Sequence, residues 1–326
     1  MPTRNAATAT SGAGPCCTNL DDCYTNSEHP ALKRGKNLIP GTRSLFINAK
    51  YYKPRTLEDA IAALASGEAR ILAGGTDFYP ALGPGGLEET VVDVSGLEEL
   101  RGVSKDRDGF RIGGLTSWSE ILRTPLPRGF DGLKAAAREV GSVQIQNRAT
   151  VAGNLCNASP AADGVPPLLA LDAEVELAST AGSRRMPLAD FIVGNRKTRR
   201  KPDELLTAVL VPGGLQDAAS RFVKLGARRY LVISIAMVSV VVLVRERRVA
   251  EARVAVGSCS AVAQRLRALE AALVGVPARN GVGGVARTEH FLPLSPIDDV
   301  RATAQYRMEA ARRLVERTLN ACVENG

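Results

Sequence analysis

The sequence predicts an α+β protein, and two observations carry this prediction. In the C-terminal third, three runs typical of strands precede two runs typical of helices, an order that favours an antiparallel sheet. Between residues 46 and 214, short strand-like and helix-like segments follow one another. The chain has 326 residues, 45% of them hydrophobic, which is a globular composition and enough for two or three domains.

Folded sequence is expected to begin near residue 46. Residues 1–45 are polar and rich in Gly, Ser, Thr, Asn and Pro, so we expect a flexible extension there. Next comes a predicted helix that Thr56 caps and whose first turn carries Glu58 and Asp59. Three apolar residues share one face of that helix: Leu57, Ile61 and Leu64.

The middle of the chain alternates between element types. Strands are predicted at 70–73, 90–94, 109–116, 173–177 and 204–211. Helices are predicted at 117–122 and 132–140, and residues 141–167 are interpreted as a loop. The texture changes after Pro212, where strands are predicted at 220–226, 231–244 and 248–258, and helices at about 264–274 and 299–322.

The most apolar run, residues 231–244, is rich in β-branched side chains. Its 14 residues fall short of the roughly 20 that a membrane-spanning helix needs, so we interpret it as a buried strand. The N-terminus has no apolar stretch of the kind found in secretion signals. Six cysteines without regular spacing favour a reducing compartment, and we expect a cytoplasmic protein without a membrane span.

The net charge of +8 raises the question of nucleic acid binding. Arginines occur in scattered pairs, however, and aromatic residues make up only 4% of the chain. A nucleic-acid surface more often clusters its charge and interleaves aromatic rings for stacking. Scattered charge favours a solvated face or a docking surface for acidic partner chains, so we expect no nucleic acid.

The stretch ILAGGTDFYPAL, residues 71–82, ends an apolar run at Gly74-Gly75 and then offers Thr76 and Asp77. Two adjacent glycines cost conformational entropy, so the backbone there is expected to need a positive φ or a close approach to a ligand. A plain turn from strand to loop explains these four residues equally well.

A second stretch, residues 147–177, is rich in small and polar residues: Thr150, Gly153, Asn154, Asn157, Ser159 and Asp163. Small residues let backbone N–H groups point at an anion, as in the nests that hold pyrophosphates. Asp163 is a possible acceptor for ribose or ribityl hydroxyls. Two such segments indicate a clamp on a dinucleotide. No G-K-[ST] sequence occurs, so a P-loop is excluded.

Metal and hydrolase chemistry find little support. Three cysteines fall in the extension and three are isolated in the rest of the chain, where we expect them to be buried: Cys16, Cys17 and Cys23, then Cys156, Cys259 and Cys322. The two histidines, His29 and His290, form no ligand cluster and have no partners for a Ser–His–Asp site.

Four motifs together resemble a known family. In chain order they are ILAGGTDFYPAL, TVAGNLCNASPAADGVPPLLALDAEVEL, RKTRRKPDELLTAVLVP and RFVKLGARR. This order resembles that of the FAD-binding medium subunits of molybdenum hydroxylases, over about residues 46–322. The resemblance implies an FAD-binding domain of the vanillyl-alcohol-oxidase (PCMH) type at 46–214, with two α/β subdomains split near residue 100. It also implies a C-terminal α+β domain of the CO dehydrogenase flavoprotein type at 215–326.

The resemblance also implies a cofactor site. Its first loop around the FAD pyrophosphate would be Ile71, Leu72, Ala73, Gly74, Gly75, Thr76, Asp77 and Phe78, and its second Thr150, Val151, Ala152, Gly153 and Asn154. Thr116 and Asn157 complete the set expected to bind the cofactor. Asp163 would hold the cofactor's hydroxyls, Leu205 or Leu206 would lie against the flavin, and Lys224 would lie near the isoalloxazine.

In this family the substrate is oxidised on another chain, so no catalytic residue is expected here. The resemblance implies a large molybdopterin subunit, a small subunit with two [2Fe–2S] clusters, and electron exit through FAD to NAD⁺, oxygen or another carrier. Two alternatives stay open from the residues. One is a free-standing FAD-dependent oxidoreductase, and the other is a basic non-enzymatic protein that binds nucleic acid or acts as a scaffold.

Overall fold

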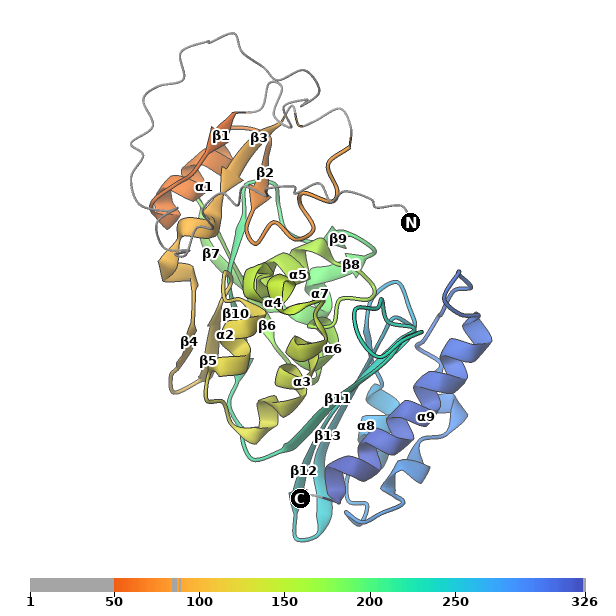
Figure 1. Cartoon of the computed structure of the whole chain (residues 1–326). Coiled ribbons are helices and arrows are strands. Elements are labelled where there is room, and N and C mark those ends of the chain that lie inside the picture. The colour runs from red at the N-terminus through yellow and green to blue at the C-terminus, as the bar shows by residue number, and fades with distance from the viewer. Residues whose placement is uncertain (1–49, 84–86, 88, 325–326) are drawn as a thin grey trace, which may run out of the picture. The chain divides into compact units, whose positions relative to one another are not determined.

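The computed structural model describes residues 50–83, 87 and 89–324 (Figure 1). The predicted extension at 1–45, with Cys16, Cys17, Cys23 and His29, lies outside these residues. In the part of the chain that is described, no helix is both long enough and apolar enough to cross a membrane.

The first sheet is small and parallel. Its strands lie in the order β1 (Tyr51–Tyr52), β3 (Thr90–Asp93) and β2 (Ala69–Leu72), and α1 (Leu57–Ala65) packs beside them. The helix starts as predicted, because the Thr56 hydroxyl accepts a hydrogen bond from the Asp59 N–H at 3.1 Å. Its buried residues Ala60 and Leu64 belong to the same hydrophobic core as Val92 of β3.

The second sheet has five antiparallel strands, and the predicted strand at 204–211 is its centre. In order across the sheet they are β4 (Val103–Lys105), β5 (Gly109–Gly113), β10 (Leu205–Pro212), β6 (Glu174–Ser179) and β7 (Gly182–Pro187). The helices α2 (Trp118–Arg123), α3 (Asp131–Glu139) and α7 (Leu188–Phe191) contribute to the same core. A separate two-stranded hairpin, β8 (Ile192–Gly194) and β9 (Lys197–Thr198), contacts α5 (Val151–Asn157).

The prediction of a loop at 141–167 is wrong. This region forms three short helices: α4 (Val143–Arg148), α5 (Val151–Asn157) and α6 (Val165–Ala170). Ser142 and Thr150 cap the first two through their hydroxyls. Helices of six or seven residues show too few turns for a periodic pattern, and their stability comes from packing against the rest of the core.

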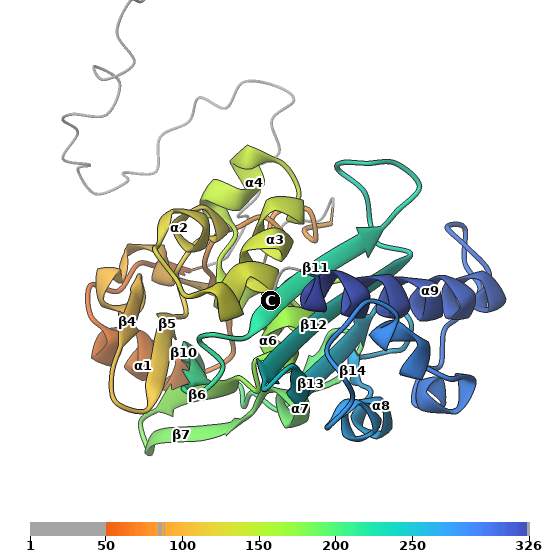
Figure 2. The ribbon, with the colours of Figure 1, turned by 90° about the horizontal axis from the view of Figure 1, so that it is seen from below.

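The C-terminal sheet is antiparallel, as predicted, in the order β11 (Ala219–Leu225), β12 (Ala236–Arg245), β13 (Arg248–Gly257) and β14 (Gln264–Arg265). The helix α9 (Ala304–Val323) packs on β11 and β12, and α8 (Arg267–Leu273) packs on β13 (Figure 2). On β12, Val240 and Val242 belong to the core under α8 and α9, whereas Val241 belongs to the core shared with α3 and α6. Helices therefore cover both faces of this sheet, which explains why β12 is apolar at most of its positions.

Two predicted boundaries in this region are corrected. The strand expected at 231–244 begins only at Ala236, and residues 226–235 form a connection that is exposed at 227–231 and buried at its end. Leu231 in this connection has a φ of 52°. Amino-acid composition alone does not distinguish the apolar end of this connection from a strand. The helix expected from residue 299 begins at Ala304, where the Thr303 hydroxyl caps it.

Candidate functional site

The two glycine-containing segments touch each other, and Gly74 lies at one of the points of contact. A Cβ atom on Gly74 would lie 2.0 Å from the carbonyl oxygen of Arg148, so no side chain fits there. Gly75 has a φ of +78°, a conformation that strongly favours glycine. Gly74 is therefore required by the packing of the two segments, and Gly75 by the left-handed turn that follows β2.

A cavity of about 800 Å³ opens between these segments, which is the size range of small-molecule sites. It gathers most of the residues that the sequence places at the cofactor. Those that line it are Ile71, Ala73, Gly74, Gly75, Thr76, Asp77, Phe78, Thr150, Ala152, Gly153, Asn154, Asn157, Leu205 and Leu206. Cys156, expected to be buried, is only partly so and lines the cavity, whereas Cys259 and Cys322 are buried.

Three of the predicted residues lie behind the cavity wall. Leu72 and Val151 are buried in the core. Thr116 is fully buried, where its hydroxyl donates to the Gly102 carbonyl at 2.9 Å and its own carbonyl accepts from the Val151 N–H at 3.0 Å. Thr116 thus fixes the start of α5, and no atom of it lines the cavity.

The remaining two predicted residues, Asp163 and Lys224, form a buried ion pair. The Lys224 ammonium donates to a carboxylate oxygen of Asp163 at 2.9 Å, and the Ser234 hydroxyl donates to the other oxygen at 3.3 Å. Lys224 also donates to the carbonyl of Glu139 at 3.2 Å, and the next residue, Val140, lines the cavity. Neither side chain of the pair lines the cavity, and the pair lies behind the wall near Val140. Contact between this pair and a cofactor therefore stays a prediction.

Burial raises the pKa of Asp163 to about 6, although Lys224 opposes this shift. Because the folded-state pKa lies above the ordinary value of 3.8, the folded protein binds the extra proton between about pH 6 and pH 4. We expect acidification from pH 7 to pH 4 to raise the free energy of unfolding of the wild type by about 2–3 kcal/mol relative to Asp163→Asn. Urea unfolding of both proteins across this range measures the difference.

Glu204 provides a control of opposite sign. Hydrogen bonds from Arg184 hold the pKa of the Glu204 carboxyl below its usual value. Its contribution to stability is therefore present at neutral pH and is lost on acidification. The difference in the free energy of unfolding between the wild type and Glu204→Gln should therefore shrink on acidification. If the difference between the wild type and Asp163→Asn also shrinks on acidification, the raised pKa of Asp163 is wrong.

One wall of the cavity is strongly cationic, and the sequence prediction did not include it. Arg70, Arg196, Lys197 and Arg200 line the cavity, whereas Asp77 is the single carboxylate among the described lining residues. Three of these cations come from the β8–β9 hairpin and the turn after it. The sequence signal for this wall is the basic run at 196–201, whose arginine pair is one of the scattered pairs that predict a solvated face or a docking surface.

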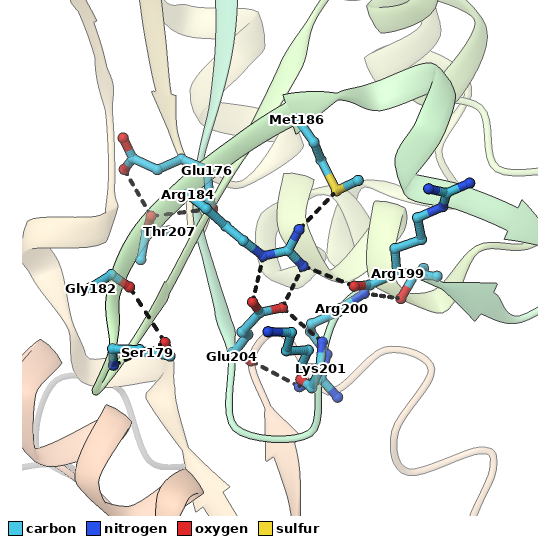
Figure 3. Close-up of polar contacts among 12 residues, drawn as sticks. Glu176, Ser179, Gly182, Arg184, Met186, Arg199, Arg200, Lys201, Glu204 and Thr207 are labelled. Atoms are coloured by element: carbon cyan, nitrogen blue, oxygen red, sulfur yellow. Dashed lines mark hydrogen bonds and ion pairs between the residues drawn. The ribbon is translucent and has the colours of Figure 1, made fainter.

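The turn that joins β9 to β10 is fixed by a polar network (Figure 3). The Arg184 guanidinium donates to both oxygens of the buried Glu204 carboxylate, at 2.6 and 2.9 Å. Glu204 also accepts from the Lys201 N–H at 2.7 Å, and its carbonyl accepts from the Arg200 guanidinium at 2.8 Å. This network sets where β10 begins, and with it the position of the cavity-lining Leu205.

The lining suits a ligand with one anionic and one apolar part. Cations and a small-residue loop are the groups that bind phosphates, and Ile71, Ile145 and Leu206 offer apolar surface for a ring system. The side-chain oxygen of Asn154 is buried and has no hydrogen-bond partner among the described residues. In residues 50–83, 87 and 89–324, no three His, Cys, Asp or Glu side chains come together as metal ligands would.

Comparisons with known proteins agree with this chemistry. Residues 47–214 match the family model described as the FAD binding domain in molybdopterin dehydrogenase. Residues 221–322 match that of the CO dehydrogenase flavoprotein C-terminal domain. Over 84% of the chain, the structure superposes on 97% of a chain of carbon monoxide dehydrogenase from Hydrogenophaga pseudoflava, with a TM-score of 0.77 and 26% identity.

Two curated relatives align with part of the chain. The nicotinate dehydrogenase FAD-subunit of Eubacterium barkeri is 36% identical over 57% of this chain and 66% of its own length. The xanthine dehydrogenase FAD-binding subunit of Escherichia coli O157:H7 is 37% identical over 52% of this chain and 59% of its own length. The chain therefore spans less than two thirds of the length of these relatives.

Proposed function

Because the chain belongs to the family of FAD-binding medium subunits of molybdenum hydroxylases, we propose that it is the electron-exit subunit of such a complex. In this proposal it receives electrons from the [2Fe–2S] clusters of a small partner subunit and delivers them to NAD⁺, oxygen or another acceptor. A large molybdopterin subunit would carry the substrate. FAD supplies the redox chemistry, and the protein supplies position and electrostatics.

The single observation that carries the proposal is the cavity between two touching glycine segments. Backbone N–H groups of the segment after β2 and the hairpin cation Arg196 are proposed to bind the diphosphate of FAD. Leu205 and Leu206, at the start of β10, provide apolar surface for the flavin. The buried pair of Asp163 and Lys224 lies behind the wall near Val140 and is proposed to orient that end of the cofactor.

The proposal extends to the organisation and location of the chain. We propose that residues 46–214 form the FAD-binding domain and residues 215–326 the C-terminal domain, in keeping with the two matched regions. The three described cysteines are all free thiols, which supports the cytoplasm as the place where the complex works.

The experiment is the visible absorption spectrum of the purified chain, followed by chromatography of the released cofactor. We expect a flavin spectrum and release of FAD on denaturation. A colourless protein that binds polyanions with strong salt dependence would contradict the proposal and favour the nucleic-acid or scaffold alternative.

Co-purification separates the proposed complex from a free-standing oxidoreductase. We expect a tagged chain from its native host to bring with it an iron–sulfur chain and a molybdopterin chain. If the chain instead runs alone and oxidises a substrate with its own flavin, the proposal of an electron-exit subunit is wrong.

A further inference from the structure

Three side chains form a hydrogen-bonded relay at the cavity. The Asn157 amide nitrogen donates to the Asp77 carboxylate at 3.0 Å, and the Arg196 guanidinium donates to the Asn157 amide oxygen at 2.7 Å. All three residues line the cavity. They come from the segment after β2, from the last residue of α5 and from the β8–β9 turn, so the relay joins three separate parts of the wall.

From this relay we infer that Arg196 is a specificity residue that recognises the diphosphate of the flavin nucleotide, with Asn157 and Asp77 as its positioning residues. The inference rests on the proposed function, because it assumes that FAD occupies this cavity. It adds a reason why the chain would hold FAD in preference to a flavin without phosphates.

The backbone under Arg196 is held in place. Arg196 has a φ of 55°, and its N–H donates to the carbonyl of Ala158 at 2.9 Å. Ala158 itself ends α5 with a φ of 48°. The turn is thus tied to the end of α5, and the Arg184–Glu204 network holds the chain just beyond it (Figure 3). A guanidinium on a fixed backbone loses less entropy when it binds an anion.

The other cations of the wall either form ion pairs or hydrogen bonds with other groups, or lack the backbone support that Arg196 has. Arg70 pairs with Glu89 at 3.4 Å and lies over the ring of Phe78. The Arg200 guanidinium donates to three backbone carbonyls within its own turn. Arg196 also uses only one terminal nitrogen among the described residues, but its partner is the Asn157 side chain at the cavity and not the backbone of its own turn. The rest of its five N–H donors are available to a phosphate.

The chain offers a matched control three residues further on. Arg199 is exposed and belongs to the same basic run, but it does not line the cavity. Substitution of either arginine by glutamine removes one positive charge from the same basic run. A general electrostatic effect would therefore weaken binding in both variants, whereas direct recognition would weaken it only in Arg196→Gln.

The test titrates the full-length apoprotein with FAD and with riboflavin, following flavin fluorescence, for the wild type and for Arg196→Gln, Arg196→Lys and Arg199→Gln. We expect Arg196→Gln to raise the Kd for FAD by about ten- to a hundredfold, as loss of a charge-assisted hydrogen bond predicts. The Kd for riboflavin should not change, and Arg199→Gln should bind FAD as tightly as the wild type. The Kd of Arg196→Lys for FAD should lie between those of the wild type and Arg196→Gln, because lysine keeps the positive charge but lacks the planar set of guanidinium donors.

The outcomes that would overturn the inference are distinct from failure of the proposed function. If the wild type binds FAD and Arg196→Gln binds it equally well, only the role of Arg196 is wrong. If Arg196→Gln weakens FAD and riboflavin by the same factor, or if Arg199→Gln weakens FAD as much, recognition of the diphosphate by Arg196 is likewise wrong. If the wild type binds no FAD, the proposed function fails together with the inference.

Discussion

Replacement of Gly74 by valine is expected to remove FAD from the purified protein almost completely. The new Cβ atom would meet the Arg148 carbonyl oxygen at 2.0 Å and the Ala149 Cα at 3.0 Å, and both are backbone atoms that cannot rotate away. The segment after β2 must therefore move off the start of α5, which widens the gap between the two walls of the cavity. We expect FAD content below about one-tenth of the wild-type value, equivalent to about 1.4 kcal/mol or more of lost binding free energy.

Gly83 provides the matched control in the same connection. A Cβ atom there would meet nothing within 4 Å, and its φ lies outside the left-handed region, so Gly83→Val should retain FAD. Flavin absorbance relative to protein absorbance, measured after gel filtration, gives both results. A folded Gly74→Val protein with wild-type FAD content would show that the contact between the two segments does not shape the cofactor site.

The strands and the glycine segments could be predicted because their signals are local. The apolar run at 204–211 is the central strand β10, and the glycine pair at 74–75 ends β2 as its sequence indicates. The sequence did not show whether this glycine pair serves a ligand or only a turn. The reason for the missing side chain at Gly74 is the Arg148 carbonyl, 74 residues away along the chain, and only the tertiary structure brings it there.

The incorrect predictions have the same cause, because they concern features that depend on tertiary contacts. Residues 231–235 are as apolar as the strand that follows, yet they belong to a connection and not to the strand, so composition alone predicts a start that is too early. The basic run at 196–201 became part of a cavity wall only because the β8–β9 hairpin contacts α5. Charge that is scattered in sequence can be concentrated in space, and a single sequence does not show where.

Substitution of Arg265 by methionine is expected to cause a large loss of stability in the C-terminal sheet. The buried Arg265 guanidinium donates to both oxygens of Glu270, at 2.5 and 2.8 Å, and to the Leu169 carbonyl at 2.7 Å. It also pairs with Asp172 at 2.6 Å, so it joins β14 to the end of α6. Its removal leaves the buried Glu270 carboxylate without its main partner, and we expect the free energy of unfolding in urea to fall by about 3–5 kcal/mol.

A second substitution separates the cost of the unpaired charge from the loss of packing. Glu270 also accepts the Val254 N–H at 2.9 Å, so Glu270→Gln removes the charge while an oxygen remains for that N–H. In the Arg265→Met background, Glu270→Gln should therefore recover a large part of the lost stability, because a neutral amide is cheaper to bury than a carboxylate that keeps only the more distant Arg267 at 3.5 Å. The exposed pair of Arg313 and Glu309 serves as the control, and Arg313→Ala should leave unfolding unchanged. If Glu270→Gln destabilises the Arg265→Met protein further, the unpaired carboxylate is not the source of the loss, and the guanidinium acts through its bonds to Leu169 and Asp172 instead.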